Sequence, residues 1–364
     1  MKKLIVLITL LFSVLAAFAA DKPVIKVGVV VPLSGNMAFL GENARSGMLL
    51  RKKEMSANTH FDYQLIFEDD EFVPAKTNMA VRKLKALDNI DVLVTLWANS
   101  YDVAMPLIKG SHIVHMSPEC WANPTGYPYD FVLGGACDDY ASMMANALNA
   151  LHAKKIAVFS SQASYNTLFH KALSQKLEKM KITIADFHMT NSETRDFRTY
   201  ALKLEEIKPD ILVVTAGVPM AEIALRQMHQ IGYHPLVAGG TADFLDINHE
   251  VTDGGFYVLT IPTTDAFEKK FQSAYKHSSV YPAANAYDTL SVLINACEQL
   301  PGKSKPSAEA ISNQLRKTQE FSGAMGNTSF TAPNKLSCPL AYYLIQDGKS
   351  KVVTLDELVK FYNK

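Results

Sequence analysis

The chain has 364 residues, in which 36 basic side chains balance 36 acidic ones, and 48% of the residues are hydrophobic. This length suits two domains with separate cores, and the composition is that of a soluble globular protein. Without an excess of Lys and Arg, the surface has nothing to hold nucleic acid or anionic lipid, so neither is expected as a partner.

The N-terminus has the pattern of a secretory signal peptide over residues 1–19. Lys2 and Lys3 precede an apolar run at residues 4–15, and Ala17-Phe18-Ala19 is a small-x-small cleavage site. We expect cleavage after Ala19, and because Lys2 and Lys3 leave with the peptide, 34 basic residues then face 36 acidic ones, a net charge of −2. No later apolar run reaches the ~20 residues of a membrane span. The predicted location is the periplasm.

Short apolar strands alternate with amphipathic helices from residue 25 onward. Strands are predicted at residues 25–31, 63–67, 91–96, 112–116 and 129–133, and helices at 41–55, 74–87 and 101–109. The third strand leads into a predicted turn at residues 97–100, and the fourth ends in residues 117–121. Alternation of this kind predicts parallel βαβ units.

The same pattern starts again beyond residue 140. Strands are predicted at 155–159, 182–187, 211–214, 236–238 and 256–259, helices at 141–151, 167–180, 197–207 and 220–231, further helices at 265–277, 283–299 and 308–318, and a hairpin at 341–353. We therefore predict an α/β protein with two doubly wound parallel-sheet lobes joined by crossover segments. The lobes are assigned residues 20–136 with 262–336 (N-terminal) and residues 137–261 with 337–364 (C-terminal).

The two tryptophans of the chain each follow a predicted strand: Trp97 comes after the third and Trp121 after the fourth. In open parallel sheets, ligands bind outside the carboxyl ends of the strands. With Tyr101 and Tyr165, the two indole rings are suited to stack an aromatic ligand or to surround an organic cation. The alternative is that both tryptophans only pack between the lobes.

Polar residues beside the tryptophans are candidates for orienting the ligand. Glu119 offers a charge opposite to that of a cation, with a solvated loop carboxylate as the alternative. Asn99 and Ser100 are suited to hydrogen-bond a carboxylate or a carbonyl group. The acidic run at residues 68–71 lacks the glycine and the spacing of a calcium loop, so a solvated strand end is expected there.

Several short motifs occur along the chain, and their order and spacing are informative together. They are residues 27–35, Ser117-Pro118, Asp196-Phe197 with Lys208-Pro209-Asp210, residues 223–227 with Ile231-Gly232, and Ala286-Tyr287-Asp288. In these motifs, which span nearly all of the mature chain, the protein resembles the leucine/isoleucine/valine-binding proteins, the periplasmic solute receptors of ABC transporters. The resemblance implies the type I periplasmic-binding fold, whose lobes close on a ligand by a hinge motion.

The resemblance also implies the positions of the ligand contacts. They are Phe39, Trp97, Ala98, Asn99, Ser100, Glu119, Cys120, Trp121, Tyr165, Gly217, Val218, Gly240 and Thr241. Ala98 stands where the amino-acid binders use a serine for the ligand carboxylate, and Gly217 replaces a tyrosine. Gly240 or Thr241 replaces the glutamate that holds the ligand ammonium group. We therefore expect an aromatic molecule, an apolar amino-acid-like molecule or an organic cation as the ligand.

No catalytic or cofactor-binding motif is found, so neither an enzyme nor a cofactor is expected. His112 and His115 lie three apart in a strand and point to opposite faces, which argues against a shared metal. Export permits disulfides among the four cysteines. Cys120–Cys137 is the preferred pair, and reduced, buried thiols are the alternative.

The expected role is that of a monomeric, non-catalytic receptor that delivers a small molecule to the membrane permease and ATPase of an ABC importer. The alternative is a ligand-sensing receptor for a signalling partner. An exported enzyme is the third reading, and the absence of catalytic motifs argues against it.

Overall fold

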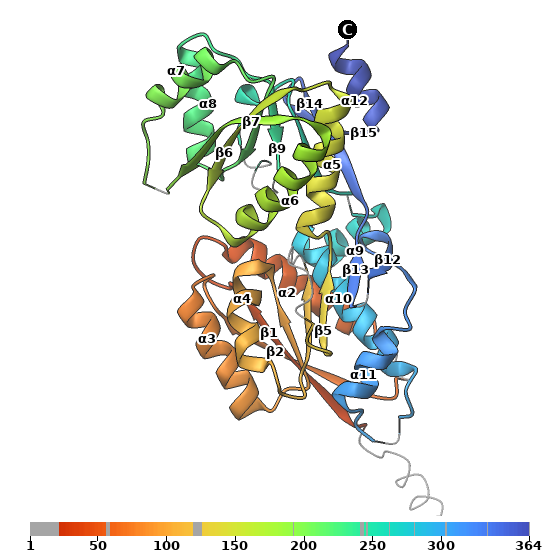
Figure 1. Cartoon of the computed structure of the whole chain (residues 1–364). Helices are drawn as coiled ribbons and strands as arrows, with labels where there is room; N and C mark the ends of the chain where they lie inside the picture. The colour runs from red at the N-terminus through yellow and green to blue at the C-terminus, as the bar shows by residue number, and fades with distance from the viewer. Residues whose placement is uncertain are drawn as a thin grey trace, which may run out of the picture.

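The computed structural model describes residues 22–55, 59–118, 126–191, 193–240, 244, 247–261, 263–279, 281–302, 304–332 and 334–363. These residues form two α/β lobes, one above the other in Figure 1. The predicted signal peptide lies outside the described residues, as do the site residues Glu119, Cys120, Trp121 and Thr241. No helix in the described ranges has the length and hydropathy needed to cross a bilayer.

The N-terminal lobe is built on a sheet with the strand order β11-β12-β13-β5-β4-β3-β1-β2. Its strands are β1 (Val24–Val31), β2 (Asp62–Asp69), β3 (Val92–Thr95), β4 (Val114–Pro118), β5 (Asp130–Leu133), β11 (Glu320–Gly323), β12 (Gly326–Ala332) and β13 (Lys335–Ser337). From β5 to β2 every pairing is parallel, whereas β11, β12 and β13 pair antiparallel with one another. Strand β1 is almost entirely β-branched and buried, as expected for a parallel strand covered on both faces.

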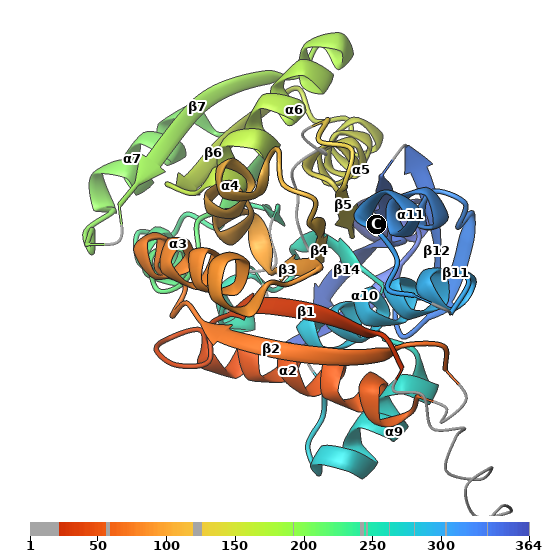
Figure 2. The same cartoon turned by 90° about the horizontal axis from the view of Figure 1, so that it is seen from below.

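Helices cover both faces of this sheet (Figure 2). They are α2 (Ala38–Lys53), α3 (Pro74–Lys83) with the π-helical turn η2 (Leu84–Asp88), α4 (Trp97–Ile108), α9 (Asp265–Tyr275), α10 (Tyr281–Glu298) and α11 (Ala308–Leu315). Met48 of α2 and Leu290 of α10 pack on one face, in a cluster with Val27. Val81 of α3 packs on the other face, with Val30. Alternate residues of β1 therefore enter two separate cores.

The C-terminal lobe has the strand order β15-β14-β10-β9-β8-β6-β7. Its strands are β6 (Lys155–Ser161), β7 (Thr183–Thr190), β8 (Ile211–Thr215), β9 (Val237–Gly239), β10 (Phe256–Thr260), β14 (Leu340–Gln346) and β15 (Lys349–Val353). Its helices are α5 (Cys137–Ala150), α6 (Ser164–Met180), α7 (Arg198–Ile207), α8 (Met220–Gln230), the short 3-10 helix η4 (His249–Val251) and α12 (Leu355–Tyr362). The five strands from β7 to β10 are parallel, and β14 and β15 form the predicted hairpin.

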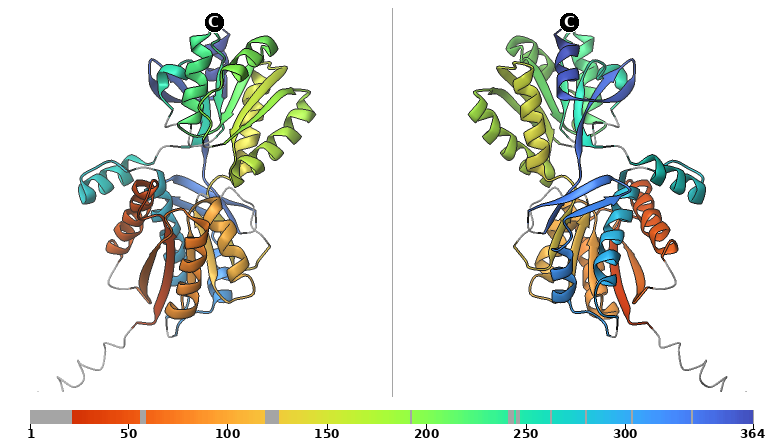
Figure 3. Two further views of the ribbon diagram at one scale, coloured as in Figure 1. Left: turned by 90° about the vertical axis from the view of Figure 1, so that its left-hand side faces the viewer. Right: turned by 90° about the vertical axis from the view of Figure 1, so that its right-hand side faces the viewer.

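The chain passes between the two sheets at three places, visible in the side views of Figure 3. The crossings follow β5, β10 and β13. They are bonded to one another, because Gly134 N–H donates to Leu336 O (2.8 Å) and Ile261 N–H donates to Pro339 O (3.0 Å). The lobe boundaries predicted from the sequence fall in these segments, and we retain them as a proposal.

Two local predictions are corrected by the structure. The predicted turn at residues 97–100 is the first turn of α4, which begins at Trp97 directly after β3. The preferred disulfide Cys120–Cys137 is not formed, since Cys137 is a buried free thiol whose S–H points to Tyr165 O (3.9 Å). Cys137 opens α5 of the C-terminal lobe, and its thiol faces that lobe rather than the strands of the N-terminal sheet.

Candidate functional site

The carboxyl ends of the parallel strands lie where the two lobes meet. Strands β5 and β10 end at crossings into the other lobe, so their carboxyl ends face it directly. Helix α4, which follows β3, contacts α6, which follows β6 (Figure 1). Most of the predicted ligand contacts therefore sit in the region in which an α/β sheet ordinarily binds its ligand.

Trp97 occupies the junction between β3 and α4 with a left-handed backbone, at a φ of 60°. Its side chain is 4% exposed and belongs to the core of the N-terminal lobe. The indole ring meets the edge of Phe72 in a T-shaped pair, with 5.6 Å between ring centroids. Phe72 follows β2, so these two rings together close the carboxyl ends of two strands of the sheet.

Ser100 is held by a buried carboxylate. Its hydroxyl donates to Asp70 Oδ2 (2.9 Å), and the Thr77 hydroxyl donates to the same oxygen (2.8 Å). Phe72 N–H donates to the other oxygen (3.0 Å), and Asp70 is fully buried. The expectation of a solvated strand end is therefore wrong for Asp70, because three donors replace its water. The network fixes α3 and α4 against the loop after β2.

Apolar side chains are exposed at this edge of the N-terminal lobe. Phe39, in the first turn of α2, is 60% exposed, and Val73, just before α3, is 40% exposed. Ala98 is buried, and Asn99 is partly exposed. Phe72 and Val73 were missed from the sequence. The available signal was Pro74, because a residue before proline favours extended backbone, as Val73 has at the start of α3.

In the C-terminal lobe, Tyr165 and Gly240 are in direct contact. The Tyr165 hydroxyl donates to Gly240 O (2.6 Å), and its ring stacks on Phe169 with 5.7 Å between centroids. A Cβ at Gly240 would lie 2.7 Å from Thr215 Cγ2 and 2.9 Å from the Phe169 ring. Only glycine allows the chain after β9 to approach so closely.

A buried histidine that the sequence did not single out organises the neighbouring strand ends. His170 Nε2 lies 2.8 Å from Thr215 Oγ1 and 3.1 Å from Ser160 Oγ. Burial lowers the pKa of His170 to about 4, so the imidazole is neutral at pH 7. Asn166 Nδ2 donates to Thr215 O (2.9 Å). These contacts hold β6, β8 and α6 together beneath Tyr165.

Gly217 and Val218 follow β8, beside this cluster. Val218 is 39% exposed, and the Val218–Pro219 peptide bond is cis. Of the predicted contacts within the described residues, one group lies after β1 and β3 (Phe39 and 97–100) and a second after β6, β8 and β9 (Tyr165, 217–218 and Gly240). Each group lies on the carboxyl edge of its own sheet.

One hydrogen-bond chain in the N-terminal lobe has the order of a catalytic relay. Thr95 Oγ1 lies 2.9 Å from His115 Nε2, and His115 Nδ1 lies 2.9 Å from Asp130 Oδ1. Tyr101 donates to the other Asp130 oxygen (2.6 Å). All four side chains are buried, so no substrate reaches the hydroxyl, and we interpret the chain as a polar core network. In the described part of the chain, no cluster of three or more metal-ligating side chains is found.

Comparisons with a family model and with a curated relative both point to periplasmic binding proteins. The model of the periplasmic binding protein family matches residues 24–349. The Leu/Ile/Val-binding protein homolog 3 of Brucella melitensis is 22% identical over 348 residues, which cover 91% of this chain and 94% of that protein.

Solved structures with the same fold include receptors for different ligands. A leucine-binding protein, LivK, from Thermotoga maritima has a TM-score of 0.78 at 17% identity, covering 91% of this chain and 98% of its own. A solute-binding protein from R. palustris in complex with benzoate also has a TM-score of 0.78, at 18% identity, with coverages of 91% and 95%. LivJ from Streptococcus pneumoniae, in complex with isoleucine, has a TM-score of 0.77 at 20% identity. The match covers 91% of this chain and 99% of the LivJ chain. The chain belongs to the periplasmic binding protein family, among the leucine/isoleucine/valine-binding proteins with the type I fold.

Proposed function

We propose that this protein is the solute receptor of an ABC importer, and that it captures a small organic molecule between its lobes and delivers it to a permease. The observation that carries the proposal is the family match over residues 24–349, on a fold whose two sheets turn their carboxyl ends toward each other. The receptor has no catalytic step, and the transporter's ATPase supplies the energy for import.

The ligand we favour is a small aromatic or apolar molecule. Phe39 and Val218 expose apolar side chains at the carboxyl edges of the two sheets, where a ligand held between the lobes would contact them. Ala98 has no hydroxyl to offer a ligand carboxylate, and the Ser100 hydroxyl is bonded to Asp70. Fold relatives in complex with benzoate and with 3,4-dihydroxybenzoic acid are consistent with a ligand of this class. Asn99 remains as a polar group that could orient it.

The two lobes would close around the ligand because it contacts residues of both. The ligand would touch residues 97–100 and Phe39 on one side, and 217–218 with Gly240 on the other. Such a ligand has more contacts in the closed state than in the open state, so it shifts the population toward closure. The three crossings are the segments that would bend. The permease would then recognise the closed form.

A binding screen tests this function. Protein refolded free of ligand is titrated with aromatic acids, phenylalanine, amides, quaternary amines, and leucine, isoleucine and valine, with tryptophan fluorescence and thermal unfolding as readouts. A ligand at 100 times its Kd should stabilise the fold by about 2.7 kcal/mol. A response only to leucine, isoleucine or valine would overturn the proposed ligand class. Conversion of any bound compound by the pure protein would overturn the receptor role.

A further inference from the structure

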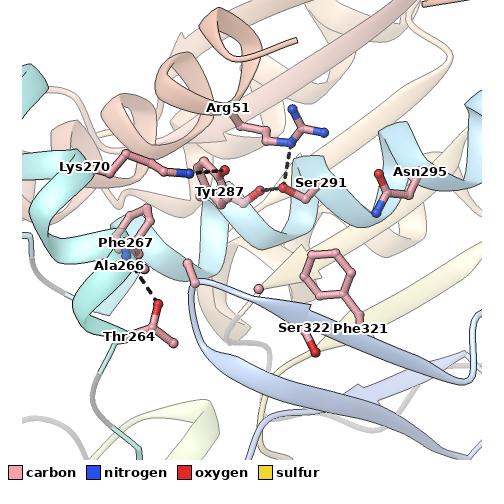
Figure 4. A pocket seen from close by; sticks show the side chains of 12 residues that line it. Arg51, Thr264, Ala266, Phe267, Lys270, Tyr287, Ser291, Asn295, Phe321 and Ser322 are labelled. Carbon is pink, nitrogen blue, oxygen red and sulfur yellow. Dashed lines mark hydrogen bonds between the residues drawn. The ribbon is translucent and has the colours of Figure 1, made fainter. Parts of the chain in front are cut away.

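A second pocket lies in the N-terminal lobe, beside α10 (Figure 4). It is formed by α2, α9, α10 and β11, and its volume is about 320 Å³. Cavities of this size hold small organic ligands in other proteins. None of the residues predicted as ligand contacts lines it.

Three aromatic side chains are among the otherwise mainly polar and small residues that line this pocket. Phe267 of α9 and Tyr287 of α10 form a T-shaped pair with 5.2 Å between centroids. Phe321 of β11 lies across from Ser291 and Asn295 of α10 in Figure 4. A flat apolar molecule would find ring faces and edges on two sides of this space.

Among the described residues, one of the two cations that line the pocket has no counter-ion. Lys270 is paired with Glu54 (Nζ–Oε1, 3.1 Å), whose other oxygen accepts the Tyr287 hydroxyl (2.5 Å). The Arg51 guanidinium has a neutral partner only, because Nε donates to Ser291 Oγ (2.9 Å) and no ion pair of Arg51 occurs within the described residues. The nearby carboxylate of Asp288 lies behind the pocket floor and accepts the N–H groups of residues 324 and 325.

Within the described residues, neither terminal nitrogen of the Arg51 guanidinium has a hydrogen-bond partner. Proteins use a guanidinium of this kind to grip a carboxylate through two parallel hydrogen bonds. One positive charge matches a ligand with one negative charge. We propose that this pocket is a second binding site, and that it accepts a small aromatic monocarboxylate with its carboxylate on Arg51 and its ring beside Phe321 and Tyr287.

The pocket also adjoins a crossing between the lobes. Thr264, at the end of the second crossing, lines it and caps α9 by accepting a hydrogen bond from Phe267 N–H (3.3 Å). Thr264 N–H in turn donates to Ala324 O (2.8 Å), in the pocket floor. A molecule bound here contacts a segment that bends when the lobes close, and this position gives the second site a means to influence closure.

The test uses sodium benzoate as the probe and the methyl groups of Ala266 and Ala324, which line the pocket, as reporters. The full-length mature protein with 13C-labelled alanine methyl groups is titrated, and its methyl spectra are recorded at constant ionic strength. We expect saturable shifts of both methyl resonances, with binding weakened at least about tenfold in Arg51→Gln, as loss of a charge-assisted contact would give.

The matched control is Arg45→Gln, which removes the same charge from the same helix while leaving the pocket intact. It should bind benzoate as the wild type does. Ala266→Trp provides a second route, since Ala266 is exposed on α9 and a larger side chain there fills the pocket without entering the core. It should abolish the Ala324 shift.

Two results would overturn the second site. In one, benzoate shifts the two methyl groups equally in the wild type and in Arg51→Gln, as closure around a ligand in the first site alone would do. In the other, sodium sulfate or acetate produces the same saturable shifts, so that the pocket does not select for an aromatic ring. Neither result touches the receptor function, which is tested by the ligand screen on Arg51→Gln.

Discussion

Tyr165 shows how a predicted ligand contact has a structural task of its own. Its hydroxyl is buried and bonded to Gly240 O at 2.6 Å. Tyr165→Phe removes the donor that the described residues offer to that carbonyl, so we expect a loss of about 1–2 kcal/mol in the free energy of unfolding, measured by urea denaturation. Tyr129→Phe is the control, because no hydrogen bond of the Tyr129 hydroxyl is found in the described part of the chain. Equal stability of the two variants would show that the hydrogen bond from Tyr165 to Gly240 O does not stabilise the fold.

Phe39 is the opposite case, an exposed side chain that packing does not explain. Phe39→Ala should change stability by less than about 0.5 kcal/mol, as surface substitutions do. It should weaken binding of the ligand found in the screen about tenfold, measured by calorimetry, because apolar contact is lost. Leu202→Ala removes a comparable exposed side chain from α7, at 56% exposure, and should leave affinity unchanged. Unchanged affinity in Phe39→Ala would remove this residue from the site.

His170 makes stability depend on pH. Its pKa falls from 6.5 to about 4 in the folded protein because the imidazole is buried. The unfolded chain therefore binds one more proton between these values, and this contribution to stability, present above pH 6.5, is lost as the pH falls to 4. The loss amounts to about 3 kcal/mol. Urea titrations across this range should show a shallower pH slope in His170→Gln than in His112→Gln, where the replaced histidine is exposed. Parallel slopes would contradict this assignment.

At the scale of elements, the sequence predicts the parallel part of both sheets closely. The strand expected at 25–31 is β1 (Val24–Val31), and that expected at 211–214 is β8 (Ile211–Thr215). These strands are continuous apolar runs because helices cover both faces, and such runs are visible in a sequence. Strands β11 to β13 were not predicted, since β13 has three residues and β11 and β12 are largely polar. Pairing with a sheet edge, not local pattern, makes them strands.

The start of α4 was missed for a related reason. Residues 97–100 contain Asn and Ser, which favour turns in isolation, yet they form a helical turn. The Ser100 hydroxyl is bonded to Asp70, from a loop 30 residues earlier. A contact of that range has no local signature, and it holds a residue of the first turn of α4 in place. Phe39, by contrast, was named as a ligand contact only through the family resemblance, and its exposure was not predicted from the sequence.

The hydrogen bond from Ser100 to Asp70 allows a test of whether Ser100 stabilises the fold or binds the ligand. Ser100→Ala removes one of three donors to the buried Asp70 carboxylate, so we expect stability to fall by about 1–3 kcal/mol. Ligand affinity should change less than threefold, because the hydroxyl is already occupied. Urea denaturation measures the change in stability, and calorimetry measures the change in ligand affinity. A large loss of affinity with little loss of stability would mean that Ser100 binds the ligand directly, as first expected from the sequence.

At the scale of the molecule, the described residues join the two lobes through the bonded crossings, the contact of α4 with α6 and a side-chain bridge. Lys335 of β13 reaches across to Asp139 of α5 (2.9 Å), beside the first crossing. The Asp139 carboxylate also accepts Ala136 N–H (3.0 Å), which fixes the start of α5. This bridge ties the N-terminal sheet to the first helix of the other lobe. Bending is thereby confined to the few residues of each crossing, and the lobes are expected to move as rigid bodies.

Rigid-body closure gives the last prediction. Small-angle X-ray scattering of the mature protein should show a smaller radius of gyration when a saturating ligand from the screen is added, because the lobes then share it. Phe39→Ala at the same ligand concentration should show a smaller change, since fewer molecules are closed. Leu202→Ala should behave as the wild type does. If the ligand binds with full affinity and the scattering curve does not change, closure is not the response to binding, and the permease must recognise something other than a closed form.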